Sequence, residues 1–375
     1  KLIIILIMNI KFITFSPEAP ASKFYFDALS LSNNFTISTN EDFSNIDYVF
    51  FMSYADDLKE LKKFKRKYSK IKTAIIDPRN KKVDTYIKYC DFLIVDSIEM
   101  KDYFSKFAIP IFTYIEYPFF IKSPKKHKEK DLLIIGYHGN KVHLTAMYPK
   151  ITSALKYLSM ENKIEFWAIY DIKGLGRWNI GIPDGLKVRH IQWHPNVYTE
   201  ELTQIDIGVV PSTLPVKKNI KNVSKFFLDS EEDYIIKFKM PSNPGRLAVF
   251  AKLGIPVVAD FLPSHFQFIK NGYSGFIADS SGAWYKALKS LTESTNLRNS
   301  LAENMFKTYE ESFDFEKQNS NLFSWLKQLS GDNLSSSKKQ IEYVEKTDFQ
   351  SNIKFNNAFF YNSLFKLARK IKFFF

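Results

Sequence analysis

Cysteine is nearly absent from the sequence. Cys90 is the only one in 375 residues, which excludes an internal disulfide and a cysteine-based zinc cluster. The six histidines are scattered and show no metal-ligand spacing. We therefore expect no bound metal, a reducing compartment and a cytoplasmic location.

Long apolar runs are also lacking. The opening stretch KLIIILI is too short to span a bilayer and has no small-residue cleavage site. It is a strand extension, an upstream translation artefact or a fragment of a signal, and we favour Met8 as a candidate natural start. No other segment has the composition of a transmembrane helix.

Three glycine-containing signatures are missing as well. The sequence has no Walker-type loop, no Gly-x-Gly-x-x-Gly after the first predicted strand and no Gly-x-Ser-x-Gly. These absences disfavour P-loop enzymes, common dinucleotide-dependent enzymes and α/β-hydrolases.

Positive charge is abundant. Lysine and arginine number 53 against 40 acidic residues, which gives a formal net charge of +13. Such an excess favours an anionic partner, whether a sugar nucleotide, a phospholipid surface or nucleic acid. The lysines scatter over many predicted helices and no RNA-binding signature is present. We therefore expect no nucleic-acid partner.

The chain has the length and composition of two globular domains, each with its own core. In the first half, short apolar runs alternate with helical stretches, which indicates a parallel α/β sheet. The predicted strands there are Ile10–Phe15, Tyr48–Met52, Lys72–Ile76, Phe92–Val95 and Ile111–Ile115. The predicted helices are Lys23–Ser30, Asp57–Lys70 and Ile98–Phe107.

A charged segment without apolar periodicity, Lys122–Lys130, reads as a linker. A second alternation follows it. Its predicted strands are Leu132–Gly136, Ile164–Tyr170, Leu186–His190, Ile205–Val210 and Ile255–Ala259, and another short strand is expected at the end of residues 237–279. Its predicted helices are Thr145–Leu158, Tyr198–Gln204, Leu247–Leu253, Ala283–Leu291, Asn296–Glu310 and Glu316–Leu329.

One stretch, residues 237–279, combines a basic turn with a helix. Lys239 and Arg246 flank the sequence PSNPG, and Gly254 is placed to end the following helix. Cations and backbone N–H groups ahead of a helix form a natural anion site. A basic surface loop before a core helix is an equally good interpretation.

Polar residues at strand ends are further candidates, because parallel sheets bind ligands at the carboxyl ends of their strands. Glu18 and Ser22 follow the first strand and are candidate ligand-binding residues, unless they only form a turn. Asp96 is a third such candidate, with a helix N-cap as the alternative. His138 follows the first strand of the second half and is either a ligand-binding group or a plain loop histidine.

A family resemblance emerges from three ordered pieces: IGYHGN at 135–140, DIGVVPS at 206–212 and KMPSNPGRLAVFAKLGIPVVAD at 239–260. Together they resemble GT-B glycosyltransferases, most closely family 4, the "group 1" transferases. The resemblance implies an α/β fold with two Rossmann-like domains facing each other across a cleft. It covers about residues 131–310 well and the first half loosely.

The resemblance also implies domain boundaries and partners. Residues 1–125 would form the acceptor domain, 131–315 the nucleotide-sugar domain, and 316–330 a helix returning to the first domain. A nucleotide sugar would be the donor substrate, a glycan or lipid-linked molecule the acceptor, and no cofactor would be bound permanently. Basic side chains would replace a metal at the departing diphosphate.

By this resemblance, Glu18, Ser22 and Asp96 would lie on the acceptor side. The catalytic candidates are His138, Lys239 and Arg246. The candidates for holding the nucleotide sugar share the same three motifs. They are Gly139, Asn140, Pro211, Ser212, Ser242, Asn243 and Gly245.

The sequence departs from the family where many members carry two glutamates eight positions apart. Pro241 and Val249 occupy those positions here. Family 4 enzymes retain the anomeric configuration, and we expect the same of this chain in surface polysaccharide synthesis. A non-catalytic nucleotide-sugar or glycan-binding protein of the same fold is the alternative.

The remaining residues, 331–375, read as a linker and a basic amphipathic tail. In NSLFKLARKIKFFF, from Asn362 to Phe375, apolar and basic residues interleave as interfacial anchors require. We expect this tail either to bind an anionic membrane surface or to pack onto the protein itself.

Overall fold

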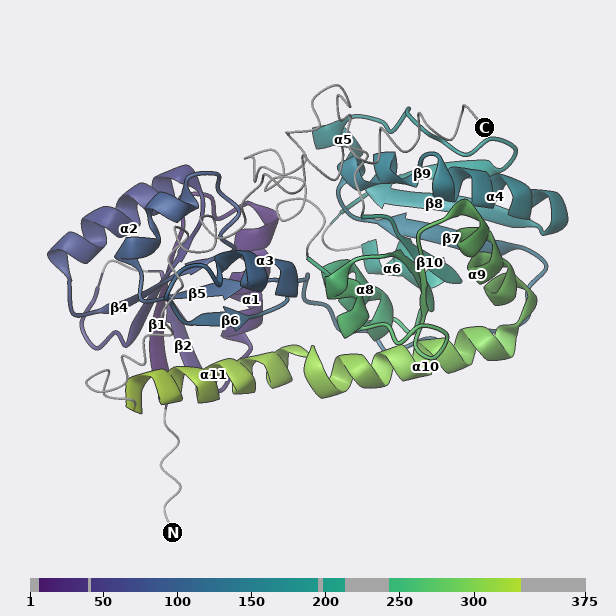
Figure 1. Ribbon diagram of the computed structural model, residues 1–375. Helices are drawn as coiled ribbons and strands as arrows, with labels where there is room; N and C mark the ends of the chain where they lie inside the picture. The colour runs from purple at the N-terminus through teal and green to yellow at the C-terminus, as the bar shows by residue number, and fades with distance from the viewer. Residues whose placement is uncertain (1–6, 40–41, 195–197, 213–242, 332–375) are drawn as a thin grey trace, which may run out of the picture. The chain divides into compact units, whose positions relative to one another are not determined.

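The computed structural model describes residues 7–39, 42–194, 198–212 and 243–331. These residues contain two six-stranded sheets in which every strand pair is parallel (Figure 1). None of their helices combines the length and apolar character needed to cross a bilayer.

The first sheet has the strand order β2-β1-β3-β4-β5-β6. The chain therefore reverses its direction of travel across the sheet between β1 and β3, and ligands of open parallel sheets bind near such a switch point. The strands are β1 (Met8–Ile13), β2 (Phe35–Ser38), β3 (Tyr48–Met52), β4 (Lys72–Ile76), β5 (Phe92–Val95) and β6 (Ile111–Thr113).

Both faces of the first sheet are covered, as its continuous apolar strands require. Val49 and Phe51 of β3 join one core cluster with Leu61 of α2 (Ala55–Lys67). Phe50 lies between them in sequence, and its ring packs edge-on against Phe92. The other helical segments are α1 (Pro20–Ser30), η1 (Val83–Thr85), η2 (Ile87–Tyr89) and α3 (Ile98–Phe104).

The second sheet has the strand order β12-β11-β10-β7-β8-β9. Its switch point falls between β7 and β10, which are direct neighbours. The strands are β7 (Leu133–His138), β8 (Ile164–Tyr170), β9 (Lys187–Gln192), β10 (Ile207–Val210), β11 (Val257–Asp260) and β12 (Phe276–Ala278).

Helices α4 (Lys150–Glu161) and α9 (Ser281–Glu293) pack together over the second sheet (Figure 1). Leu155 of α4 and Leu288 of α9 are both fully buried in the cluster that they share with β7 and β8. The other helical segments are η3 (Lys141–Met147), α5 (Ile172–Leu175), α6 (Tyr198–Gln204), α8 (Gly245–Lys252), η6 (Pro263–Gln267) and α10 (Thr295–Ser312).

The last described helix, α11 (Phe315–Gly331), hydrogen-bonds to the segment after β6. Gln318 accepts from the Ile115 N–H at 2.7 Å and donates to the Ile115 carbonyl at 3.1 Å. Asn319 accepts from the Tyr114 hydroxyl at 2.9 Å and donates to the Ala28 carbonyl at 2.8 Å. The domain boundaries expected from the sequence stay a prediction.

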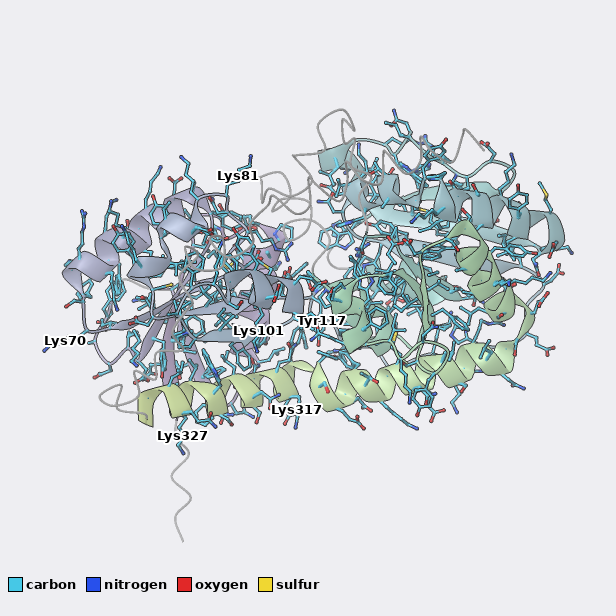
Figure 2. The ribbon with its side chains drawn as sticks, viewed as in Figure 1. Lys70, Lys81, Lys101, Tyr117, Lys317 and Lys327 are labelled. Carbon is cyan, nitrogen blue, oxygen red and sulfur yellow. The ribbon has the colours of Figure 1, made fainter. Side chains whose placement is uncertain are left out.

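The charged segment Lys122–Lys130 forms hydrogen bonds and ion pairs with residues of the second half of the chain. The Lys125 ammonium donates to the carbonyls of Thr203 and Ile205 at 2.9 and 2.6 Å. Lys125 and Lys130 both form ion pairs with buried Asp206. The lysines labelled in Figure 2 behave differently, since Lys70, Lys81, Lys101 and Lys317 are exposed on the surface.

The predicted strands are all present, with ends shifted by up to two residues in most cases. Among the strands and α-helices, β2 and α5 were not predicted, and the 3₁₀ segments η1, η2 and η6 were not predicted either. The helix predicted at Thr145–Leu158 was wrong at its start, because α4 begins only at Lys150. Pro149 explains the break, since the residue before a proline avoids helical backbone angles and Tyr148 is extended.

Candidate functional site

The switch point of the second sheet gathers five of the residues predicted from the sequence. His138 ends β7 and Gly139 follows it, while Pro211 and Ser212 follow β10. The side chain or backbone of Arg246, the second residue of α8, contacts all four. The sequence motifs that are far apart in the chain therefore meet at one point of the sheet edge.

Arg246 is half-buried, and neutral groups hold its guanidinium. It donates to the Pro211 carbonyl at 2.8 Å and to the Ser212 Oγ at 2.6 Å. No carboxylate among the described residues forms an ion pair with it. Burial lowers the pKa of Arg246, with Tyr137 and Asp260 acting in the opposite direction. An arginine nevertheless stays protonated, so the site holds a partly desolvated positive charge.

Ser212 is fully buried and fixed from three directions. Its N–H donates to Asp260 Oδ2 at 2.6 Å, and its Oγ lies 3.4 Å from His265 Nε2. His265 Nδ1 faces the Asp260 carbonyl at 2.7 Å, so this nitrogen carries the proton and Nε2 is the acceptor. The Ser212 hydroxyl can therefore donate to His265 while it accepts from Arg246. Burial lowers the pKa of His265 to about 3, which keeps the ring neutral.

His138 is buried and neutral. Burial, followed by the charge of Arg246, lowers the pKa of His138 to about 3. Its Nε2 lies 3.4 Å from the Arg246 carbonyl, and its ring packs edge-on against Phe250 at 4.8 Å. Because a carbonyl only accepts, Nε2 carries the proton and Nδ1 is left as a hydrogen-bond acceptor. His138 thus offers an acceptor to a ligand, not a positive charge.

Gly139 is required by both space and backbone conformation. Its φ is +129°, and a Cβ there would approach Arg246 Cδ and the Tyr137 hydroxyl to 3.0 Å. Asn140 follows with its side chain engaged as the N-cap of η3, accepting from the Val142 N–H at 3.1 Å. The Tyr137 hydroxyl donates to the Asn140 carbonyl at 2.6 Å.

Asn243 and Gly245 form the turn that leads into α8. Asn243 Oδ1 accepts from the Gly245 N–H at 2.8 Å, and Asn243 Nδ2 donates to Glu116. Glu116 is buried, and burial raises its pKa to about 7 even though Arg79 opposes the shift. Lys239 and Ser242, which were expected in the same turn, lie outside the described residues.

The acceptor-side candidates occupy separate places on the first sheet. Ser22 is buried on α1, with its Oγ 3.4 Å from Thr14 Oγ1, and Glu18 is exposed in the loop before α1. Asp96 is buried after β5, three strands away from β1, and forms an ion pair with Arg79. The helix N-cap considered for Asp96 is instead Ser97, which accepts from the Met100 N–H.

Three residues of these sites were not singled out from the sequence: Tyr137, Asp260 and His265. Glu116 was expected only as part of a strand end, without a role of its own. Asp260 closes the apolar run IPVVAD, so its position at a strand end was a usable signal. Glu116 also follows a predicted strand. His265 gave no local signal, because its partner Ser212 is 53 positions away. Among the described residues, no three His, Cys, Asp or Glu side chains gather as a metal site needs.

Comparison with known proteins identifies the fold. No protein-family model and no curated protein sequence matches the chain. Among solved structures, a glycosyltransferase from Rickettsia africae is similar with a TM-score of 0.56 and 11% identity, over 87% of this chain and 99% of that one. HepE from Anabaena, solved with UDP and glucose, gives 0.56 and 11%, over 86% and 100% of the two chains.

A third similar structure is sucrose-phosphate synthase from Thermosynechococcus elongatus, with a TM-score of 0.52 and 11% identity, over 86% of this chain and 99% of that one. At such identities the likeness speaks for the fold. It agrees with the two six-stranded parallel sheets and their helices. The α/β class predicted from the sequence is confirmed, and the chain has the GT-B fold.

Proposed function

We propose that this protein is a glycosyltransferase that moves a sugar from a nucleotide-sugar donor to a glycan or lipid-linked acceptor. The observation that carries the proposal is the guanidinium of Arg246, which lies half-buried at the switch point and is held by neutral acceptors. A partly desolvated cation without a carboxylate partner among the described residues is a ready site for an anion.

The proposed anion is the diphosphate of the donor. Arg246 belongs to the first turn of α8, where backbone N–H groups and the helix dipole favour negative charge. Ligands of open α/β sheets bind at a switch point such as the one between β7 and β10. The similar structures of HepE were solved with UDP, which supports a uridine nucleotide as the first probe.

In the proposed reaction, the bond from the anomeric carbon to the diphosphate oxygen breaks and the acceptor oxygen bonds to that carbon. The proton of the acceptor hydroxyl passes to the departing diphosphate. Negative charge grows on the leaving diphosphate, and fixed cations stabilise it more in the transition state than in the ground state. Arg246 and Lys239 would supply these cations in place of a metal. His138, with Nδ1 as an acceptor, would take a hydroxyl hydrogen bond from the donor. We further propose retention of configuration, by resemblance to family 4.

The second candidate is a binding protein of the same fold that does not catalyse transfer. Val249 supports this second candidate, because it occupies the position of a donor-contacting glutamate of the family and is fully buried in α8. A buried valine has no means of contacting a sugar hydroxyl. Pro241, at the other glutamate position, lies outside the described residues.

The experiment is a thermal-shift screen over nucleotides and nucleotide sugars, followed by transfer and donor-hydrolysis assays. A ligand that binds the native state raises the melting temperature according to its affinity. We expect stabilisation by a nucleoside diphosphate and release of that diphosphate from its sugar. Stabilisation without turnover over many acceptors would favour the binding protein.

Separate Lys239→Ala and Arg246→Ala variants assign the roles. Loss of one group that stabilises transition-state charge lowers turnover by about 10²–10³-fold. Folding is checked by the melting temperature of each variant. If both variants fold and keep normal activity, the donor site lies elsewhere.

The proposed setting is surface polysaccharide or lipopolysaccharide synthesis at the cytoplasmic face of a membrane. The basis is the tail in Asn362–Phe375 and the excess of lysine over acidic residues. The tail lies outside the described residues, so this setting depends on the sequence pattern.

A further inference from the structure

Glu116 lies just after β6, in a segment of the chain remote from the motifs of the second sheet. It is 7% exposed, and both its backbone carbonyl and its Oε1 accept from Asn243 Nδ2, at 3.1 and 3.0 Å. Asn243 is thus held by two acceptors of one residue. The other carboxyl oxygen of Glu116, Oε2, is buried and has no hydrogen-bond partner among the described residues.

The same contact fixes the start of α8. Asn243 Oδ1 accepts from the Gly245 N–H at 2.8 Å, which sets the first residue of the helix. Gly245 approaches Glu116 so closely that a Cβ at this position would lie 2.3 Å from the Glu116 carbonyl oxygen. Arg246 is the next residue, so its backbone position follows from this contact.

We propose that Glu116 is a positioning residue, which holds the first turn of α8 through Asn243 and thereby places the guanidinium of Arg246 for the donor diphosphate. This inference rests on the proposed function for its purpose. The contact itself depends only on the geometry of Glu116, Asn243 and Gly245.

The strength of the hydrogen bond from Asn243 depends on the charge of Glu116, and several groups influence that charge. Burial, with help from Asp77 and against Arg79 and Asn243, raises the pKa of Glu116 to about 7. The neutral hydroxyls of Tyr25 and Tyr54 also face this region, since Glu116 acts on the pKa of both. A carboxylate accepts a stronger hydrogen bond than a neutral carboxyl group. The hydrogen bond from Asn243 lowers the pKa of Glu116, so ionisation strengthens this contact in an opening that breaks it and leaves Glu116 buried. In such openings the first turn of α8 is held more firmly above pH 7 than below it.

The direct test is hydrogen exchange of the amides in residues 243–252 without any ligand, at pH 6 and pH 8. Protection factors are corrected for the intrinsic pH dependence of exchange. We expect roughly tenfold higher protection at pH 8 in the native protein, the scale of one charge-assisted hydrogen bond. Glu116→Gln keeps an acceptor for Asn243 but cannot ionise, so its protection should not change across this range. Glu116→Ala should lose roughly tenfold at pH 8.

The matched control is Glu99→Gln. Glu99 is a half-buried carboxylate that accepts from the Ser264 N–H at 2.9 Å, and burial raises its pKa too, but it does not contact the turn before α8. Its variant should keep the pH dependence of the native protein. Equal protection of residues 243–252 in the native protein and Glu116→Ala, or a pH response that survives Glu116→Gln, would overturn the proposal.

UDP titrations at the same two pH values test the link to Arg246. UDP loses a proton from its terminal phosphate at about pH 6, which changes its own charge in both titrations. We therefore expect the ratio of the affinity at pH 8 to that at pH 6 to be larger for the native protein than for Glu116→Gln. If exchange responds as expected but the native protein does not bind UDP, the positioning contact stands and the proposed function fails. If UDP binds with an affinity that is independent of Glu116, the role in placing Arg246 is wrong.

Discussion

Arg246 and Ser212 show how single residues are matched in this site. The guanidinium donates to a hydroxyl and a carbonyl, and the hydroxyl is itself oriented by a neutral histidine. A carboxylate in either place would neutralise the cation and compete with an incoming anion. Neutral partners instead fix the direction of the guanidinium and leave its charge available.

Asp57 illustrates a second type of residue, a carboxylate that resists ionisation. Its carboxylate accepts from the Phe15 N–H at 2.6 Å, and burial raises its pKa to about 6 against that hydrogen bond. The folded state thus binds a proton more tightly than the unfolded chain does. Its contribution to stability is present at low pH and is lost as the pH rises from about 4 towards 6.

We predict that the free energy of unfolding of Asp57→Asn rises relative to that of the native protein as the pH increases from 4 to 7. The asparagine cannot ionise, so it escapes the cost of charging this buried site. The shift is about 3 kcal/mol at most, from the difference between the two pKa values. Denaturant unfolding at a series of pH values measures it, and a stability difference that is constant with pH would contradict the assignment to Asp57.

At the scale of elements, the start of α8 depends on a glycine. We predict that Gly245→Ala lowers the free energy of unfolding by about 1–3 kcal/mol, because its Cβ would collide with the backbone of Glu116. UDP binding should weaken with it, since Arg246 is displaced. Gly282→Ala in α9 is the control, because nothing lies within 4 Å of a Cβ there. Equal stability of the two variants would show that α8 adjusts freely.

Helix α11 contacts the segment after β6 through a side chain that bonds backbone groups as a neighbouring strand would. Gln318 satisfies both the N–H and the carbonyl of Ile115. We predict that Gln318→Ala destabilises the protein by about 1–3 kcal/mol for each backbone group left buried and unpaired. Lys317→Ala, on the exposed side of the same helix, should change stability by less than about 0.5 kcal/mol. Chemical denaturation of both variants provides the measurement.

The elements themselves followed well from the sequence where apolar runs were bounded by turn residues. Tyr48–Met52, Lys72–Ile76 and Phe92–Val95 are strands with the predicted ends. β2 was missed because Phe35–Ser38 alternates with polar residues and only Phe35 is buried. α5 was missed because it spans just four residues. Short elements gain their stability from neighbours, which a local pattern does not contain.

The site followed from the sequence only in part. The cation before a helix and the residues at strand ends were predictable, because both depend on local order along the chain. The position of Glu116 after a strand was predictable, but its contact with Asn243 was not, because the two residues are 127 positions apart. His265 gave no local signal at all, since its partner Ser212 is 53 positions away.

At the scale of the whole molecule, positive charge is spread widely and the basic tail extends beyond the described residues. We predict that truncation after Leu329 abolishes binding to vesicles with anionic lipids while the fold is kept. Apolar residues in the tail would insert at the interface and its lysines would meet the headgroups. Vesicle sedimentation compares the two forms. Equal binding by both contradicts the prediction, and a lower melting temperature after truncation indicates a tail that packs on the protein.

The central claim is that Arg246 binds the diphosphate of the donor, and calorimetric titration with UDP tests it most directly. The native protein should bind UDP, and Arg246→Ala should bind it about 10–100-fold more weakly, the scale of hydrogen bonds to a charged group. Arg189→Ala is the matched control. Arg189 belongs to β9, away from the switch point, and its guanidinium carbon lies 4.3 Å from the centre of the Trp167 ring. The predicted result is a loss of affinity in Arg246→Ala alone, and a folded Arg246→Ala with native affinity for UDP would contradict the account.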